Sequence, residues 1–216
     1  MGLASYIEHT NLNEKATEED IKKLCKEALE YGFYGVCVYP KWVKHAKQVV
    51  DDECKVITVI SFPEGDDSTD KKQKDTEQAI ADGADEIDMV INKKALIAGE
   101  LLDSEIQDDI NAVVLAARRK PVKVIIEAAE LNKEQKIKAI NLAMAAGAKF
   151  IKTSTGRSKK GGATVEDVKL IKSIVGNQLG IKAAGGIDTR EKAEALINVG
   201  ATRIGTSKSI PIIKGY

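Results

Sequence analysis

A chain of 216 residues with 43% hydrophobic and 31% charged side chains is long enough to bury a core of its own, and its composition is typical of a globular protein. Basic and acidic residues balance at 33 each, which gives no electrostatic reason to expect nucleic acid or a membrane as a partner. Cys25, Cys37 and Cys54 form no CxxC pair and are expected to be reduced thiols. Residues 1–11 lack the basic and then apolar run of a signal peptide, so we expect a cytoplasmic protein.

Short apolar runs rich in Val and Ile alternate along the chain with longer amphipathic segments. The runs have the length of buried strands, although the first has a weak strand signal on its own. In chain order, strands are predicted at residues 5–9, 35–39, 56–61, 86–91, 122–127, 150–153, 180–184 and 202–205. Helices are predicted between them, and three have the start signal of a capping box. These signals are Thr17 with Asp20, Thr164 with Asp167, and Asp188 with Glu191.

The alternation of strands with helices implies a parallel sheet. Eight units in 216 residues leave about 27 residues for each, which favours a single (β/α)8 TIM barrel over residues 1–216. A doubly wound open sheet is the alternative, but no Gly-x-Gly-x-x-Gly follows the first strand, as its dinucleotide-binding form would require. The polar segments 64–74 and 156–162 are predicted to be loops at the carboxyl rim of the barrel, where such enzymes carry out their chemistry.

Several predicted strands carry charged residues at positions that should point into the barrel. Because strand side chains alternate between faces, Asp88, Lys152 and Lys182 are expected inside, as are Lys123 and Glu127. Buried charges are costly unless they are paired, so a structural ion-pair network is one interpretation. Lys152 and Glu127 lie toward the catalytic ends of their strands, whereas Lys123 begins its strand and is expected to be structural.

Two inward lysines on consecutive strands, Lys152 and Lys182, also have a specific chemical use. An amine must be neutral to attack a carbonyl group, and a neighbouring ammonium in a dry pocket lowers the pKa of an amine. One lysine could then form a carbinolamine and a Schiff base. A nearby carboxylate such as Asp88 could move protons with the help of water.

Three glycine-bearing loops follow late strands, at residues 155–164, 185–186 and 205–207. Glycine lets backbone N–H groups approach an anion, and barrels often bind phosphate after their seventh and eighth strands. Ordinary turn chemistry could explain any one of these loops. The three together favour a phosphorylated substrate.

The sequence Lys-Thr-Ser-Thr-Gly at residues 152–156 resembles a motif of the deoxyribose-phosphate aldolase family. Further matching stretches follow the family's order and span nearly the whole chain. They lie at residues 8–12, 35–40, 86–92, 123–127, 162–168, 181–187 and 205–207.

The resemblance implies a (β/α)8 fold with residues 5–9 as its first strand, and the reversible cleavage of 2-deoxy-D-ribose 5-phosphate to acetaldehyde and D-glyceraldehyde 3-phosphate. Lys152 matches the Schiff-base lysine, Lys182 the lysine that perturbs it, and Asp88 the proton-relay carboxylate. No cofactor or metal is expected, because the iminium acts as the electron sink. The expected partners are a small phosphorylated sugar and, as a family-level expectation, a second copy of the chain in a homodimer. The residues expected to bind substrate or phosphate are Thr153, Gly156, Gly185, Gly186 and Ser207.

Some positions depart from the family pattern, namely Glu8, Glu64, Arg157, Asp188 and Lys208. They leave the Schiff-base chemistry intact and bear on the phosphate pocket, where Arg157 or Lys208 could supply charge. One alternative function is therefore a Schiff-base aldolase for another phosphorylated sugar. A second is a barrel that binds a sugar phosphate without catalysis, which the retained lysines and Asp88 argue against.

Two residues near the predicted mouth complete the candidates. His9 is expected to be a hydrogen-bonded structural residue rather than a base. Tyr216 ends a short tail that could fold over the mouth, although a frayed end is the simpler expectation.

Overall fold

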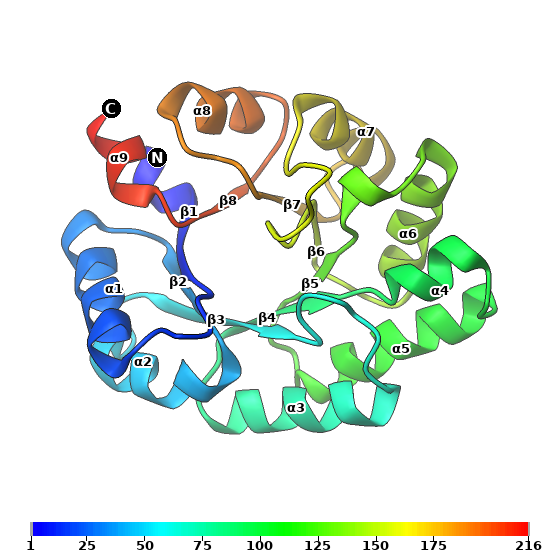
Figure 1. Cartoon of the computed structure of the whole chain (residues 1–216), viewed down its shortest axis with the longest axis horizontal. Helices are drawn as coiled ribbons and strands as arrows, with labels where there is room; N and C mark the ends of the chain where they lie inside the picture. The colour runs from blue at the N-terminus through cyan, green and yellow to red at the C-terminus, as the bar shows by residue number, and fades with distance from the viewer. Residues whose placement is uncertain (1, 216) are drawn as a thin grey trace.

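Eight parallel strands close into one barrel in the computed structural model, which describes residues 2–215 (Figure 1). Each strand pairs with the next in the sequence, and β8 pairs with β1 to complete the ring. The strands are β1 (Ile7–Asn11), β2 (Gly35–Val38), β3 (Lys55–Ile60), β4 (Glu86–Val90), β5 (Val122–Ile125), β6 (Phe150–Lys152), β7 (Gly180–Ala184) and β8 (Arg203–Thr206). The predicted (β/α)8 barrel is confirmed.

The helices surround the barrel on its outside (Figure 1). They are α1 (Glu18–Tyr31), α2 (Val43–Val50), α3 (Thr69–Ala81), α4 (Lys93–Ala98), α5 (Asp103–Ala116), α6 (Lys133–Ala145), α7 (Val165–Val175), α8 (Arg190–Asn198) and α9 (Ser209–Lys214). Short 3₁₀ helices are η1 (Leu3–Tyr6), η2 (Pro40–Trp42) and η3 (Ala128–Glu130). Across residues 2–215, no helix has the length and apolar character needed to cross a membrane.

Seven of the predicted strands coincide with strands of the structure, with ends that differ by at most two residues. The first prediction, residues 5–9, was displaced, because Leu3–Tyr6 form a 3₁₀ turn and β1 covers Ile7–Asn11. Glu8 lies within both the predicted and the observed strand, and it stands opposite Gly35 of β2 and Gly205 of β8.

Helix starts were predicted correctly at two of the three capping signals. Thr17 caps α1 in a full capping box, and the side chain of Thr164 caps α7. The third was wrong by one residue: Thr189 rather than Asp188 caps α8, because its extended backbone lets its hydroxyl accept a hydrogen bond from Lys192 N at 3.3 Å. Two potential caps in succession cannot be separated by sequence pattern alone.

Half of the segment 64–74, predicted as a loop, is helical, because α3 begins at Thr69 with Ser68 as its cap. The helix lacks an apolar stripe, which is why the pattern missed it. Its buried face includes Lys72, whose ammonium lies 2.5 Å from Asp109 Oδ2 on α5. An ion pair therefore fastens α3 to α5 where hydrophobic contacts would be usual.

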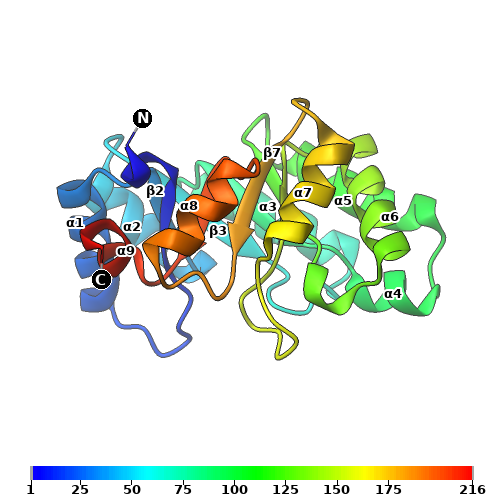
Figure 2. The same ribbon diagram turned by 90° about the horizontal axis from the view of Figure 1, so that it is seen from above.

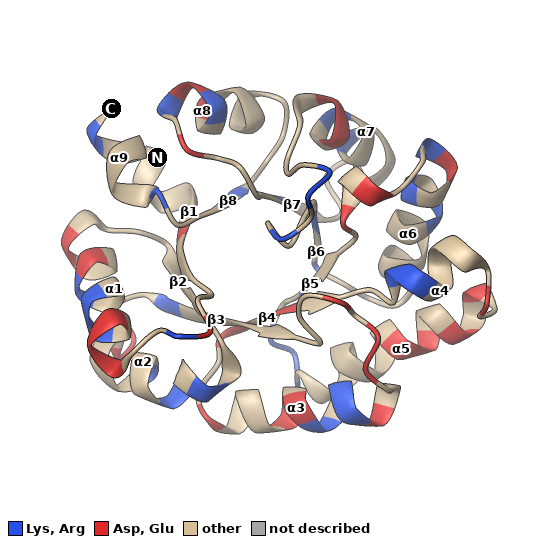
Figure 3. Ribbon diagram, viewed as in Figure 1, with Lys and Arg blue, Asp and Glu red and all other residues tan. Residues whose placement is uncertain are grey.

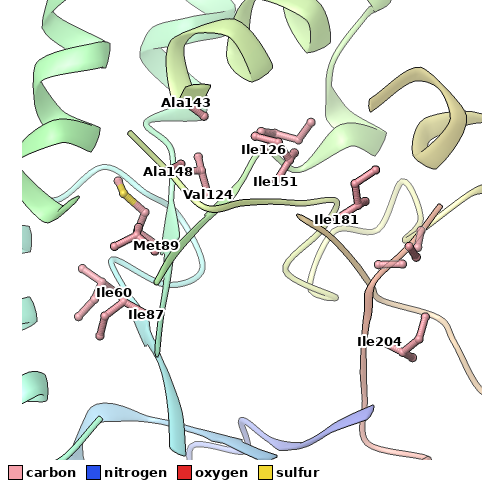
Figure 4. Close-up of a cluster of buried hydrophobic side chains, with 14 of the residues drawn as sticks. Ile60, Ile87, Met89, Val124, Ile126, Ala143, Ala148, Ile151, Ile181 and Ile204 are labelled. Carbon is pink, nitrogen blue, oxygen red and sulfur yellow. The ribbon is translucent and has the colours of Figure 1, made fainter. Parts of the chain in front are cut away.

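The main hydrophobic core lies between the barrel and its helices. Figure 4 shows side chains such as Ile87, Met89, Ile151 and Ile181 projecting from the strands toward the outer layer. All four are fully or almost fully buried, and each contributes about 1.5–3 kcal/mol relative to an exposed side chain. Since alternate residues of the same strands face the other way, the barrel interior receives the charged side chains.

Candidate active site

The side chains of Lys152 and Lys182 meet inside the barrel. Lys152 ends β6 and pairs in register with Lys182 on β7. Lys152 Nζ donates a hydrogen bond to Asp88 Oδ2 at 2.9 Å, and Lys182 Nζ donates to the same oxygen at 2.6 Å. Asp88 lies on β4, and all three residues are buried. The inward orientation predicted for them by strand alternation is confirmed.

Three further charged residues extend this cluster toward the amino ends of the strands. Lys123 Nζ lies 2.9 Å from Asp88 Oδ1 and 2.6 Å from Glu86 Oε2. It is also 3.5 Å from Glu8 Oε1, while the other oxygen of Glu8 contacts Lys182. We call the six residues the interior charge cluster: Glu8, Glu86, Asp88, Lys123, Lys152 and Lys182. Three ammonium groups and three carboxylates compensate one another within it, which offsets the desolvation cost of burying them.

The protonation states in the cluster follow from its geometry. Burial would raise the pKa of Asp88, but the charges of Lys123, Lys152 and Lys182 hold it well below the ordinary value. Burial would lower the pKa of Lys182, but the carboxylates of Asp88 and Glu8 raise it above its ordinary value. At neutral pH Asp88 is therefore an anion and Lys182 a cation, and both stand beside the amine of Lys152.

A cleft of about 740 Å³ opens at the carboxyl ends of the strands and has Lys152 in its lining. The loops that follow β1, β6, β7 and β8 form its walls, together with one face of α1. Asp88 and Lys182 do not line it, and both are fully or almost fully buried in the barrel. The cleft therefore reaches the interior charge cluster through one amine, that of Lys152, which is only 3% exposed.

Four of the five predicted binding residues line this cleft: Gly156, Gly185, Gly186 and Ser207. Thr153 does not, because its side chain is fully buried and turned toward β7. Its hydroxyl donates to the carbonyl of Ala184 at 3.2 Å and accepts from the N–H of the same residue at 3.1 Å. Thr153 thus fastens the end of β6 to β7.

Glycine is required where the loops after β6 and β7 touch. A Cβ atom added to Gly162 would lie 2.2 Å from the carbonyl oxygen of Gly185. The backbone N–H of the next residue, Ala163, donates to the carbonyl oxygens of Ala184 and Gly185, each at 3.1 Å. The two loops therefore pack backbone against backbone, and this wall of the cleft depends on the absence of a side chain at Gly162.

Glu127 lies at the carboxyl end of β5, as predicted, but just beyond the strand rather than within it. It follows the end of β5 with a positive φ of 51°, unusual for a residue other than glycine. Its carboxylate accepts the backbone N–H of Thr155 at 3.2 Å and also contacts the Thr155 hydroxyl. Burial raises the pKa of Glu127, although the hydrogen bonds from Thr155 oppose this. Glu127 therefore holds the loop that follows Lys152, a role that strand alternation could not reveal.

Two other residues singled out from the sequence are His9, which lines the cleft, and Cys37 on β2. His9 Nδ1 lies 2.8 Å from Ser209 Oγ, and Nε2 lies 3.0 Å from Glu27, so the expected hydrogen-bonded role is confirmed. Cys37 is fully buried and packs with Ile57 and Val59 inside the barrel. Tyr216 lies outside the described residues.

Arg157 reaches from the loop after β6 across the mouth of the barrel. Its guanidinium donates to the carbonyl of Leu12, after β1, and lies 6.0 Å from the ring centroid of Phe62, after β3. In Figure 2 this loop, in yellow, projects beyond the edge toward which the β7 arrow points. The charge of Arg157 thus lies at the rim of the cleft.

The sequence of this chain is similar to those of known aldolases. The model of the DeoC/LacD family aldolases matches residues 3–206. The deoxyribose-phosphate aldolase of Thermococcus gammatolerans is 52% identical, covering 100% of this chain and 96% of that protein. A Clostridium botulinum protein of the same name is 49% identical, covering 99% of this chain and all of that protein.

Solved structures agree with the sequence relatives. An aldolase named QR15 superposes with a TM-score of 0.93 and 37% identity, covering 98% of this chain and 94% of that chain. The tetrameric deoxyribose phosphate aldolase from Aeropyrum pernix gives a TM-score of 0.90 and 29% identity, covering 98% of this chain and 89% of that chain.

Proposed function

This chain belongs to the DeoC/LacD family of aldolases, and we propose that it cleaves 2-deoxy-D-ribose 5-phosphate reversibly to acetaldehyde and D-glyceraldehyde 3-phosphate through a Schiff base on Lys152. The observation that carries the proposal is the position of Lys152. Its amine joins the catalytic cleft to the interior charge cluster, and it shares one carboxylate oxygen with Lys182. A nucleophilic amine that substrate can reach, with proton-carrying groups directly behind it, is what a Schiff-base aldolase needs.

The first half-reaction forms the covalent bond. Lys152 first gives up a proton through Asp88, with which it is hydrogen-bonded, and its neutral amine attacks C1 of the open-chain aldehyde to give a carbinolamine. The carbinolamine takes up a proton and loses water to become an iminium. The 3-hydroxyl of the sugar then loses its proton, the bond between C2 and C3 breaks, and its electron pair moves into the iminium to give an enamine. Glyceraldehyde 3-phosphate leaves with the new aldehyde at the former C3.

The second half-reaction regenerates the enzyme. The enamine takes a proton at C2, and water hydrolyses the resulting iminium to acetaldehyde and free Lys152. Asp88 Oδ2, which accepts hydrogen bonds from both lysines, gives protons a short path between Lys152 and Lys182. We assign transfers to and from the substrate to this path and a water molecule in the cleft.

The phosphate group is assigned to the glycine side of the cleft. Gly156, Gly185 and Gly186 leave backbone N–H groups accessible there, and Ser207 adds a hydroxyl. Lys208 also lines the cleft and supplies positive charge. Thr153 supports this wall by holding β6 to β7 and does not contact the phosphate in this proposal.

We also propose an assembly state and a cellular location for this chain. The Aeropyrum pernix relative is described as a tetramer, which supports a homo-oligomer for this chain. The predicted homodimer and the predicted cytoplasmic location stay predictions. Analytical ultracentrifugation of the purified chain tests the first.

Borohydride trapping tests the Schiff base. Reduction in the presence of deoxyribose 5-phosphate should attach a stable adduct to the peptide that contains Lys152, as read by mass spectrometry. Lys152→Ala should form no adduct, and its turnover rate should fall by about 10⁴-fold or more. Lys149→Ala, an exposed lysine in the same segment, is the matched control and should retain both.

Two outcomes would overturn parts of the proposal. Tight reversible binding of the sugar phosphate with no adduct on Lys152 would indicate a binding protein. Turnover of a different sugar phosphate, with none of deoxyribose 5-phosphate, would refute the substrate and leave the Schiff-base chemistry in place.

A further inference from the structure

A second cleft of about 400 Å³ lies at the same end of the barrel as the catalytic cleft. The segment after β3, helix α4 and the loop after β6 form its walls. Two carboxylates, Glu64 and Glu130, line it together with five basic side chains. The basic residues are Lys93, Lys94, Arg157, Lys159 and Lys160. Figure 3 shows the basic residues, in blue, on α4 and on the loop over the barrel mouth.

The positive charge of this cleft is only partly compensated. Lys94 is paired, because its ammonium lies 2.7 Å from Asp66 Oδ2. Within residues 2–215, no carboxylate lies within 4.0 Å of the cationic groups of Arg157, Lys159 or Lys160. Three cations on one short loop therefore face the cleft without an acidic partner, which favours an anion in the space between them.

Lys93 gives a second, independent indication. The residue is only 8% exposed, yet its side chain lines the cleft. Its ammonium lies 3.4 Å from Glu130 Oε2 and 3.8 Å from Glu64 Oε2. Lys93 is therefore ion-paired with both carboxylates, but at distances longer than those of a close hydrogen bond. An ammonium has three donors, so oxygen atoms of a ligand in the cleft could accept closer hydrogen bonds from Lys93 than these two carboxylates do.

We propose that this second cleft binds a small phosphorylated molecule at a site distinct from the catalytic cleft. Lys93 would donate to the phosphoryl oxygens from the floor, and Lys159 and Lys160 would supply charge from the loop. Pro63 and Ile97, the latter 45% exposed, offer an apolar surface to the uncharged part of such a ligand. The proposal concerns binding alone and holds whatever reaction Lys152 performs.

Arg157 connects the two clefts, because it lines both. A phosphoryl group in the second cleft would attract its guanidinium and hold the loop after β6 in place. Since the same loop carries Gly156 in the catalytic cleft, occupancy of the second cleft is expected to act on substrate binding rather than on the chemical step.

NMR titration of the full chain with pyrophosphate as the probe tests the site at constant ionic strength. Pyrophosphate should shift the amide resonances of residues 93–97, a segment that lines the second cleft through Lys93, Lys94 and Ile97 and does not line the catalytic one. The double variant Lys159→Ala/Lys160→Ala should weaken that binding at least tenfold. The shifts at Gly186 and Ser207 in the catalytic cleft should keep their wild-type concentration dependence. Lys22→Ala/Lys26→Ala removes two exposed lysines from α1 and is the charge-matched control, in which both sets of shifts should be unchanged.

Each other outcome would overturn the proposal. Shifts confined to the catalytic cleft would show that the second cleft does not bind phosphoryl groups. Equal weakening in the two double variants, or equal shifts with sodium chloride at matched ionic strength, would show that net charge alone was responsible. Lys93→Met is a further test, because it removes a cation that is not on the loop after β6. It should weaken binding at residues 93–97 by a similar factor.

Discussion

Lys152 and Lys182 stand side by side as register partners on neighbouring strands, and their ammonium groups meet at a single carboxylate oxygen. Only Lys152 borders the catalytic cleft. We therefore expect the two lysines to have different tasks although they share one partner. In the proposed reaction, Lys152 bonds with substrate, and Lys182 is a buried cation that exchanges protons with it.

Replacing Lys182 by Met should separate these tasks. We expect kcat to fall by about 10²–10⁴-fold, because a proton-carrying group next to the reacting amine is lost. KM should change little, since Lys182 does not line the cleft. Steady-state kinetics with deoxyribose 5-phosphate measure both values. Lys182→Arg keeps the charge and should retain the fold, and a Met variant with near wild-type kcat would refute the role.

Asp88→Asn should destabilise the protein by roughly 3–5 kcal/mol, because three buried ammonium groups would be left with two carboxylates. The pKa of Asp88 is lowered on folding, so its stabilisation is fully present above the unfolded value and is lost as the pH falls through the folded value. The difference between wild type and variant should therefore be constant between pH 7 and pH 5 and shrink in stronger acid. Urea unfolding at several pH values measures it, and an unchanged difference at pH 2 would contradict the assignment.

Glu127→Gln should show the opposite pH dependence. Burial raises the pKa of Glu127, so its contribution to stability is fully present below the unfolded value and is lost as the pH rises through the folded value. The glutamine does not titrate and keeps an acceptor for Thr155 N, so the variant should gain stability relative to wild type between pH 4 and pH 7. Denaturant unfolding at both pH values tests this. The exposed Glu53→Gln is the control, and a gain of equal size there would argue against a specific effect.

Gly162→Ala should disturb the wall of the catalytic cleft to which we assign the phosphate. The added methyl group would collide with the backbone of Gly185, so we expect a loss of about 1–3 kcal/mol and a higher KM. Gly99→Ala is the comparison, because Gly99 has a positive φ but open space around it. That variant should lose only the stability that a positive φ costs an alanine, and its KM should be unchanged. Thermal unfolding and KM for both variants decide whether the contact between the loops matters.

Strand alternation was the most informative sequence signal for the site. Asp88 and Lys152 interrupt apolar runs at inward positions, so their place in the barrel could be predicted before their contacts were known. The contact between Glu8 and Lys123 could not, because closure of the barrel brings together residues 115 positions apart in the sequence. Lys182 was foreseen from its strand, but its second partner, Glu8, was not.

Features that depend on loops were less accessible to sequence analysis. Glu127 follows its strand with a left-handed backbone, so the alternation that placed Lys152 did not apply to it. The start of α3 was missed because an ion pair through Lys72, rather than an apolar stripe, attaches that helix. Thr153 illustrates a different limit: its motif indicated the active site, but whether a hydroxyl faces ligand or backbone is decided by packing.

The exact balance of three ammonium groups against three carboxylates in the interior charge cluster constrains how this protein can diverge. Neutralising one member alone leaves a buried charge of opposite sign unpaired. Such a substitution destabilises the protein and should be selected against. Substitutions at Glu8, Glu86 and Lys123 are therefore expected to accumulate as joint replacements across strands, so that these positions covary among descendants while the neighbouring aliphatic residues drift independently.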